Sequence, residues 1–92
     1  MSTHERREIH YSGRVQGVGF RYTAREIAER FEVGGYVENL ADGRVELVAE
    51  GEPDEVERFL AAIGERMDRY IAGVQVRSRP ATGEFGSFLI RH

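Results

Sequence analysis

The chain has 92 residues, of which 40% are hydrophobic and 32% charged, and a formal net charge of −3. This composition is typical of one globular domain, which we expect to span residues 1–92, and the acidic balance disfavours general nucleic-acid binding. The absence of cysteine and lysine excludes disulfides, thiolate metal sites, Schiff-base chemistry and the Walker phosphate loop. No apolar run could span a membrane and residues 1–10 lack a signal-peptide core, so we expect a cytoplasmic protein without a membrane partner.

The first third of the chain predicts one strand and one helix. Residues 8–13 alternate apolar and polar side chains, which indicates a half-buried strand. Apolar residues at helical spacing then predict a helix over residues 20–32. Gly34 and Gly35 follow immediately, and we expect them to form a left-handed cap at the end of this helix.

The rest of the chain predicts a hairpin, a second helix and two more strands. Residues 36–40 and 44–51 flank an Asp-Gly pair, which is a strong signal for a tight turn between strands. A helix is expected from Pro53, because proline is favoured in a first helical turn. Residues 71–79 alternate through two valines and predict a strand, and residues 85–90 predict a short last one.

The order of these elements is strand, helix, strand, strand, helix, strand, with a short terminal strand. Two helices that each carry one apolar stripe can cover one face of an antiparallel sheet. We therefore predict an α+β fold of the ferredoxin-like, split βαβ type. This fold occurs in enzymes, RNA-binding proteins and regulatory domains, so it does not decide function.

The turn from Gly13 to Arg21 is the first place where chemistry is expected. Its glycines allow successive backbone N–H groups to point into one concavity, at the N-terminus of a helix that favours anions. Arg21, in the first helical turn, can hold two oxygens of a phosphate. The alternative is a tight strand-to-helix connection with an arginine on the surface. Tyr22 stands where a dinucleotide fingerprint needs its third glycine.

Asn39, at the end of the first arm of the hairpin, is the second candidate. Asparagine is depleted in strands, and its amide can donate and accept hydrogen bonds at once, which suits the holding of a water molecule. The alternative is that Asn39 only helps Asp42 and Gly43 to close the hairpin.

The histidines are weaker candidates for a general base. His4 and His92 lie near the two ends of the sequence, and His10 lies on the polar side of the first strand. The carboxylates are spread along exposed helix positions, and no pair of them indicates a metal site or a glycosidase.

Together these segments resemble a known family. GRVQGVGFR at residues 13–21 is similar to the first signature of the acylphosphatases. GYVEN at residues 35–39, followed by Gly43, Val45 and Gly51, resembles their second signature with its spacing preserved. The length and the order of elements also match the small members of this family, which implies the same fold.

The resemblance implies hydrolysis of acyl phosphates to a carboxylate and inorganic phosphate, with neither metal nor cofactor and without a phosphoenzyme. By matching positions, Arg21 holds the phosphoryl group and Asn39 positions the attacking water. The phosphate-binding cradle is formed by the backbone amides of Gln16, Gly17, Val18, Gly19 and Phe20.

Two positions depart from the family pattern. Tyr11 stands where a branched aliphatic residue is usual, which we expect to alter packing more than chemistry. Glu38 stands next to Asn39 where a basic or neutral residue is usual, and its charge would repel a phosphate. Because neighbours in a strand point to opposite faces, we expect Glu38 to point away from the site.

Three other functions stay open from the sequence. The chain could be a domain of a larger enzyme, as in the carbamoyltransferase that matures nickel–iron hydrogenases. We expect instead a free-standing, monomeric enzyme that acts on a small acyl phosphate, because the predicted fold ends at His92. An RNA-binding module would need exposed aromatic residues on its central strands, where only Tyr11 stands. A regulatory domain for a small ligand would bind without hydrolysis.

Overall fold

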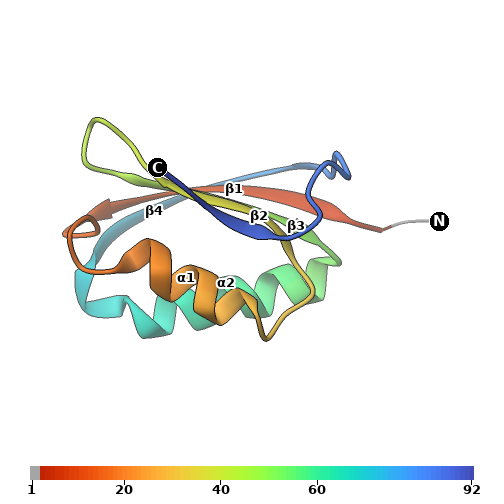
Figure 1. Cartoon of the computed structure of the whole chain (residues 1–92), viewed down its shortest axis with the longest axis horizontal. Helices are drawn as coiled ribbons and strands as arrows, with labels where there is room; N and C mark the ends of the chain where they lie inside the picture. The colour runs from red at the N-terminus through yellow and green to blue at the C-terminus, as the bar shows by residue number, and fades with distance from the viewer. Residues whose placement is uncertain (1–2) are drawn as a thin grey trace.

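The computed structural model describes residues 3–92, which form a five-stranded sheet covered on one face by two helices (Figure 1). This confirms the predicted ferredoxin-like arrangement. In chain order the elements are β1 (Glu5–Gly13), α1 (Phe20–Ala28), β2 (Gly34–Asn39), β3 (Val45–Gly51), α2 (Pro53–Arg66), the short 3₁₀ helix η1 (Asp68–Tyr70), β4 (Ile71–Pro80) and β5 (Phe88–Arg91).

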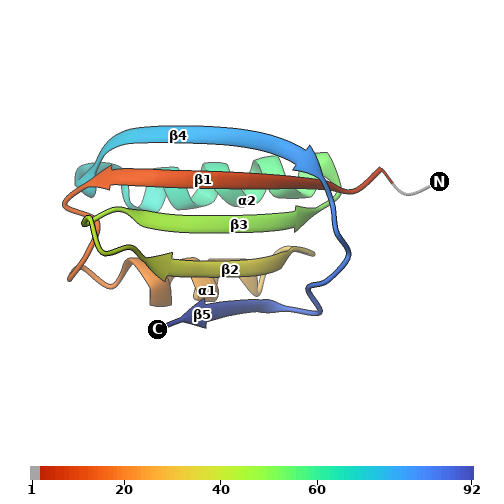
Figure 2. The same cartoon turned by 90° about the horizontal axis from the view of Figure 1, so that it is seen from above.

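The strands lie in the order β4-β1-β3-β2-β5 (Figure 2). The first four pair antiparallel, but β5 runs parallel to β2, so the sheet is mixed where the sequence predicted an antiparallel one. The strands β1, β2 and β5 all point the same way, so their C-terminal ends lie at the same end of the sheet, where α1 begins (Figure 2). This end of the sheet therefore gathers the residues that the sequence singled out.

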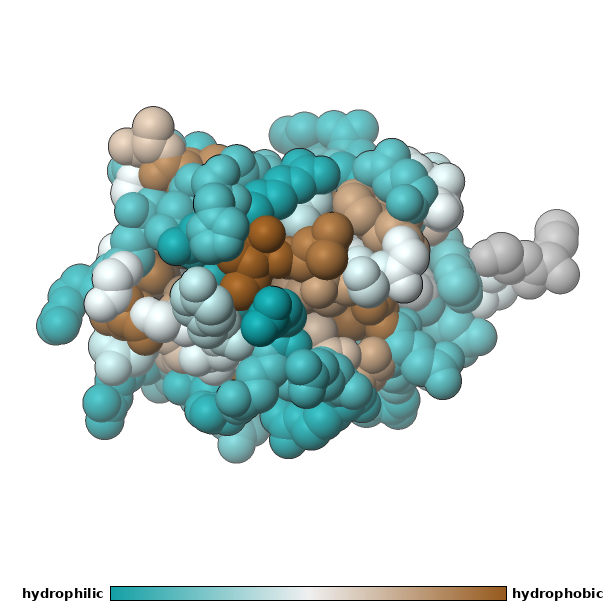
Figure 3. All heavy atoms as spheres, viewed as in Figure 1, coloured by the Kyte–Doolittle hydropathy of each residue, from teal (hydrophilic) through white to brown (hydrophobic). Residues whose placement is uncertain are grey.

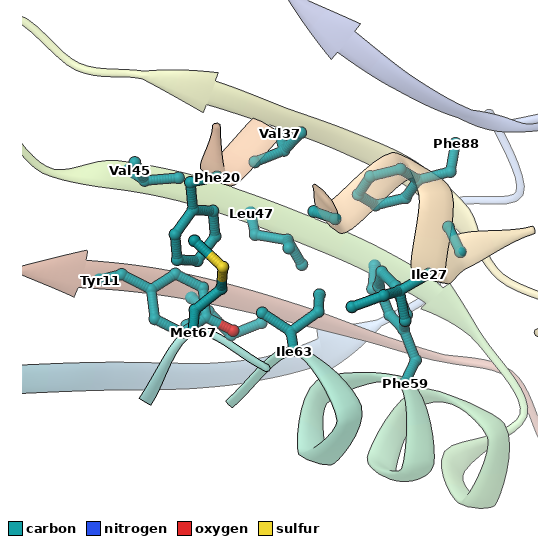
Figure 4. Close-up of a cluster of buried hydrophobic side chains, with 14 of the residues drawn as sticks. Tyr11, Phe20, Ile27, Val37, Val45, Leu47, Phe59, Ile63, Met67 and Phe88 are labelled. Carbon is teal, nitrogen blue, oxygen red and sulfur yellow. The ribbon is translucent and has the colours of Figure 1, made fainter. Parts of the chain in front are cut away.

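The hydrophobic core fills the space between the sheet and the helices (Figure 4). Alternation within β1 places Ile9 and Tyr11 on the helix-covered face, as predicted, and both are buried. The ring of Tyr11 lies 4.9 Å from that of Phe20, the first residue of α1, and Phe20 is 2% exposed. Burial of Phe20 thus fixes the start of α1 against the sheet.

The two edges of the sheet are less well covered. Val74 and Val76 in β4 pair with Tyr11 and Ile9, yet both are more than half exposed, because β4 is an edge strand with a neighbour on one side only. At the other edge, Figure 3 shows hydrophobic surface between β5 and α1, framed by hydrophilic side chains.

The prediction for the end of the first helix was wrong. α1 ends at Ala28 and not at residue 32, and residues 29–33 form a turn. The capping residue, Glu29, is right-handed, so this helix has no left-handed cap. Gly34 and Gly35 are the first residues of β2 and cap nothing. A side chain at Gly35 would lie 1.8 Å from the carbonyl oxygen of Val48, so close strand packing is what requires glycine there.

Other boundaries differ by a few residues. β1 begins at Glu5, three residues earlier than predicted, because its register with β3 and β4 continues to that residue. The last strand begins at Phe88, and Phe85 instead lies in the preceding segment, with its ring 6.0 Å from that of Tyr36. Among the described residues, no helix is long and apolar enough to cross a membrane.

Candidate active site

The candidate site lies where the loop between β1 and α1 meets the end of β2. Gly17 and Gly19 in this loop have φ angles of 77° and 79°, a left-handed conformation that glycine adopts without steric cost. Two such residues close together turn the backbone sharply between the strand and the helix. The sequence therefore folds this segment into a curl rather than an extended connection.

Three contacts hold this loop in place. The backbone N–H of Arg14 donates to the carbonyl of Tyr70 at 2.9 Å, and Val15 is fully buried. The side-chain amide of Gln16 donates to the carbonyls of Leu40 and Arg44, at 2.8 Å and 3.0 Å. Gln16 therefore ties the loop to the β2–β3 hairpin, a role that sequence reasoning missed.

The backbone amides of the loop remain open. Within the described part of the chain, none of the N–H groups from Gln16 to Phe20 donates to another backbone carbonyl. The N-cap residue of α1 is Gly19, which offers no capping side chain, and the first turn holds no acidic residue. Unpaired N–H groups and the helix dipole together favour an anion here.

Arg21 projects from the first turn of α1 and is half-buried. Its Nη1 donates to the carbonyl oxygen of Arg91 at 3.1 Å and lies 3.4 Å from Nδ1 of His92. No hydrogen bond from its Nε or Nη2 is made within residues 3–92. The edge of the guanidinium that can grip two oxygens is thus free, while the opposite corner is anchored.

Asn39 is the last residue of β2 and lies on the helix-covered face with Val37. Its Oδ1 is the one buried side-chain polar atom without a hydrogen-bond partner in the described residues. The hairpin is closed by other groups, since Leu40 donates to Arg44 and the N–H of Arg44 donates to Asp42. Asn39 is therefore not needed for the turn.

Glu38 lies on the opposite face of the sheet from Asn39. Its register partner is Glu46 in β3, on the open face, and the glutamate does not line the site cavity. The expectation from strand alternation is confirmed, so the Glu38 carboxylate is separated from the loop amides by the sheet itself.

A small cavity of about 130 Å³ joins these parts. Of the predicted site residues, Gly17, Gly19, Phe20, Arg21 and Asn39 line it, together with Val15 and Tyr22. Gln16 and Val18 belong to the same loop but do not line the cavity. Tyr22 was missed as a site residue, although its place directly after Arg21 in the first helical turn could have indicated it.

Larger hollows of about 500 Å³ lie elsewhere, one over β1 and β4 and another between α1 and β5. Neither is lined by the loop amides, Arg21 or Asn39. We favour the small cavity because the loop, Arg21 and the unpaired Oδ1 of Asn39 meet there. No cluster of three histidine, aspartate or glutamate side chains suited to a metal ion occurs in residues 3–92.

Comparisons with known proteins agree with the motifs. The acylphosphatase family model matches residues 7–90. The acylphosphatase of Rubrobacter xylanophilus is 44% identical over 88 residues, which cover 95% of this chain and 80% of the relative. The crystal structure of an acylphosphatase from Bacillus subtilis superposes with a TM-score of 0.85 at 30% identity, covering 96% of this chain and 99% of that one.

The same fold also occurs inside a longer protein. HypF from T. kodakarensis matches 96% of this chain at 30% identity and a TM-score of 0.82, but the match covers only 12% of HypF. Taken together, the match over residues 7–90 and the 44% identity to a relative of which the match covers 80% show that this chain is an enzyme of the acylphosphatase family.

Proposed function

We propose that the protein hydrolyses acyl phosphates by direct attack of water on phosphorus, without a metal ion or a phosphoenzyme. The bond between phosphorus and the acyl oxygen breaks, the carboxylate leaves with the bonding electrons, and the proton of the water ends on phosphate or in solvent. The observation that carries this proposal is the unpaired Oδ1 of Asn39 beside Arg21 and the open loop amides.

The loop amides from Gln16 to Phe20 and the free edge of Arg21 hold the phosphoryl oxygens. Charge on these oxygens is stabilised by donors that are already in place, so little reorganisation is needed during the reaction. Asn39 orients the water. An unpaired buried oxygen costs free energy, and a water molecule bound beside Asn39 recovers it.

The chemistry available suits a labile substrate. Enzymes that hydrolyse phosphate monoesters supply accelerations of up to about 10²¹-fold. No cysteine or lysine exists in the chain, and among residues 3–92 no carboxylate or histidine lines the cavity. Positioning and charge stabilisation are what such a site offers, and they suffice for a mixed anhydride whose carboxylate is a good leaving group.

The test is hydrolysis of benzoyl phosphate by the purified protein in excess EDTA, beside the Arg21→Ala and Asn39→Ala variants. We expect turnover by the parent protein, and a loss of about 10²–10³-fold in each variant, as for removal of one preorganised donor. Arg25→Ala is the matched control, because Arg25 is an exposed arginine of the same helix and does not line the cavity.

Near-full activity of either folded variant would remove that residue from the mechanism. Sensitivity to EDTA would contradict the metal-free reaction. Absence of turnover above the spontaneous rate would leave the loop as a binding or regulatory site for an anion.

We also propose that residues 1–92 form one functional domain and that the protein acts as a monomer in the cytoplasm. Light scattering of the active protein tests this proposal, since activity found only in a higher assembly would contradict it.

A further inference from the structure

Arg91, the last residue of β5, contacts two different parts of the molecule. Its carbonyl oxygen accepts the 3.1 Å hydrogen bond from Nη1 of Arg21. Its guanidinium carbon lies 3.6 Å from the centroid of the Tyr36 ring, which belongs to the open face of the sheet. One residue thus connects the candidate active site to the opposite side of the sheet.

The Tyr36 ring is a fixed platform. Its hydroxyl donates to Oε1 of Glu46 at 2.8 Å, and Oε2 of Glu46 lies 3.0 Å from Nε2 of His10. Both partners belong to interior strands of the sheet, and Tyr36 itself is 9% exposed. A guanidinium that stacks on this ring is therefore held by the rigid centre of the sheet.

β5 needs such support more than the other strands do. It has four residues, lies at the edge of the sheet and pairs with β2 alone. The ends of short edge strands open easily, because few buried contacts and hydrogen bonds oppose the opening. Yet the backbone carbonyl that holds Arg21 belongs to the last residue of this strand.

We propose that Arg91 is a positioning residue, whose stacking on Tyr36 fixes the carbonyl that orients Arg21 for the phosphoryl group. The proposal rests on the role proposed for Arg21. With the stack in place, Arg21 lines the cavity in one orientation before substrate binds. Without the stack, the end of β5 frays and the Arg21 side chain samples several rotamers. The free energy needed to order this side chain then adds to the free-energy barrier of the reaction.

The test compares kcat/KM for benzoyl phosphate, and inhibition by inorganic phosphate, in four test variants and one control variant of the whole chain. Arg91→Ala and Tyr36→Leu remove the stack, and we expect each to lower kcat/KM about two- to thirtyfold, the range that a cation–π contact covers. Inhibition by phosphate should weaken in parallel. Arg91→Lys and Tyr36→Phe keep a cation over a ring and should recover most of the activity. Arg77→Ala, an exposed arginine of the other edge strand, is the control and should change nothing.

Combining Arg91→Ala with Tyr36→Leu separates a shared role from two independent ones. If both act through one stack, the double variant loses no more than the worse single variant. Additive losses, or equal losses in Arg91→Ala and Arg91→Lys, would overturn the proposal.

A readout without substrate keeps this proposal distinct from the proposed function. The Nη1–H signal of Arg21, which reports the hydrogen bond to the Arg91 carbonyl, is identified in nuclear magnetic resonance spectra by its absence in Arg21→Ala. It should exchange faster with solvent in Arg91→Ala than in the parent protein or in Arg91→Lys. Unchanged exchange would overturn the positioning role even if the enzyme is active, whereas an inactive parent protein with faster exchange in Arg91→Ala would contradict only the proposed reaction.

Discussion

Glu50 shows how one buried carboxylate can secure a whole segment. It is 6% exposed and accepts hydrogen bonds from the backbone N–H groups of Thr82 and Gly83, at 3.0 Å each, and from the Thr82 hydroxyl at 2.9 Å. Nη1 of Arg6 adds a fourth donor at 3.2 Å. These bonds fix the start of the segment that leads from β4 to β5 across the end of the sheet.

We expect Glu50→Gln to lower the free energy of unfolding by about 2–3 kcal/mol near pH 7. The charged acceptor is lost, and the NH₂ group of the new glutamine would lie against the N–H groups that now donate to Glu50. Burial raises the pKa of Glu50, but the hydrogen bonds from the Thr82 and Gly83 N–H groups, the Thr82 hydroxyl and Arg6 together lower it by more, so the pKa lies below its ordinary value of 4.5. The unfolded chain therefore takes up this proton first as the pH falls.

It follows that the stabilisation by Glu50 is complete above about pH 4.5 and is lost as the pH falls through the lower pKa of the folded state. Urea unfolding between pH 7 and pH 3 measures this, and the difference between the parent and Glu50→Gln should shrink with acidity. Glu52→Gln, at an exposed position, is the control. A constant difference over this range would contradict the assignment.

At the scale of elements, the segment after α1 shows where local signals fail. The alternation in β1 predicted that strand and its buried face, and the helical spacing from residue 20 predicted α1, because each pattern is a property of neighbouring residues. The glycine pair at positions 34 and 35 satisfies the rule for a helix cap equally well, and only the approach of β3 reveals its true role.

The candidate site also has a part that local sequence predicts and a part that it does not. The loop and Arg21 lie within nine residues of sequence, and Asn39 follows from a second motif, so both could be predicted. The anchoring of Arg21 by β5 could not, because it depends on the parallel pairing of β5 with β2. Nothing local to residues 88–91 encodes that pairing.

Two glycine substitutions test these packing arguments. Gly35→Ala places a methyl group 1.8 Å from the Val48 carbonyl oxygen in the sheet, and we expect it to destabilise the fold by about 4 kcal/mol or more. Gly64→Ala meets no atom within 4 Å inside α2 and should stabilise the fold by about 0.5–1 kcal/mol through helix propensity. Thermal unfolding of both variants gives the comparison, and a harmless Gly35→Ala would show that β2 and β3 can separate locally.

At the scale of the whole molecule, two tyrosines on opposite faces of the sheet limit stability in alkali. Tyr11 is 3% exposed in the core, and burial raises the pKa of its hydroxyl. On the open face, burial and the neighbouring Glu46 raise the pKa of Tyr36 to about 12. Both hydroxyls ionise more readily in the unfolded chain, whose tyrosines have a pKa near 10.0. The folded state thus holds more protons above this pH.

We therefore expect the midpoint of thermal unfolding to be constant between about pH 7 and about pH 10 and to fall as the pH rises further. Tyr11→Phe should flatten this decrease, since the buried hydroxyl no longer titrates. Tyr22→Phe, at an exposed tyrosine, is the matched control. A decrease of equal steepness in Tyr11→Phe would show that other groups govern alkaline unfolding.

The position of β1 has a consequence for how the protein is made. β1 leaves the ribosome first, yet it lies between β3 and β4, and its second neighbour is complete only when residue 80 has been synthesised. Until then at least one of its edges exposes unpaired backbone groups to other nascent chains. β5, which anchors Arg21, is translated later still. Folding of the sheet and assembly of the candidate site thus wait until β4 and β5 have been synthesised.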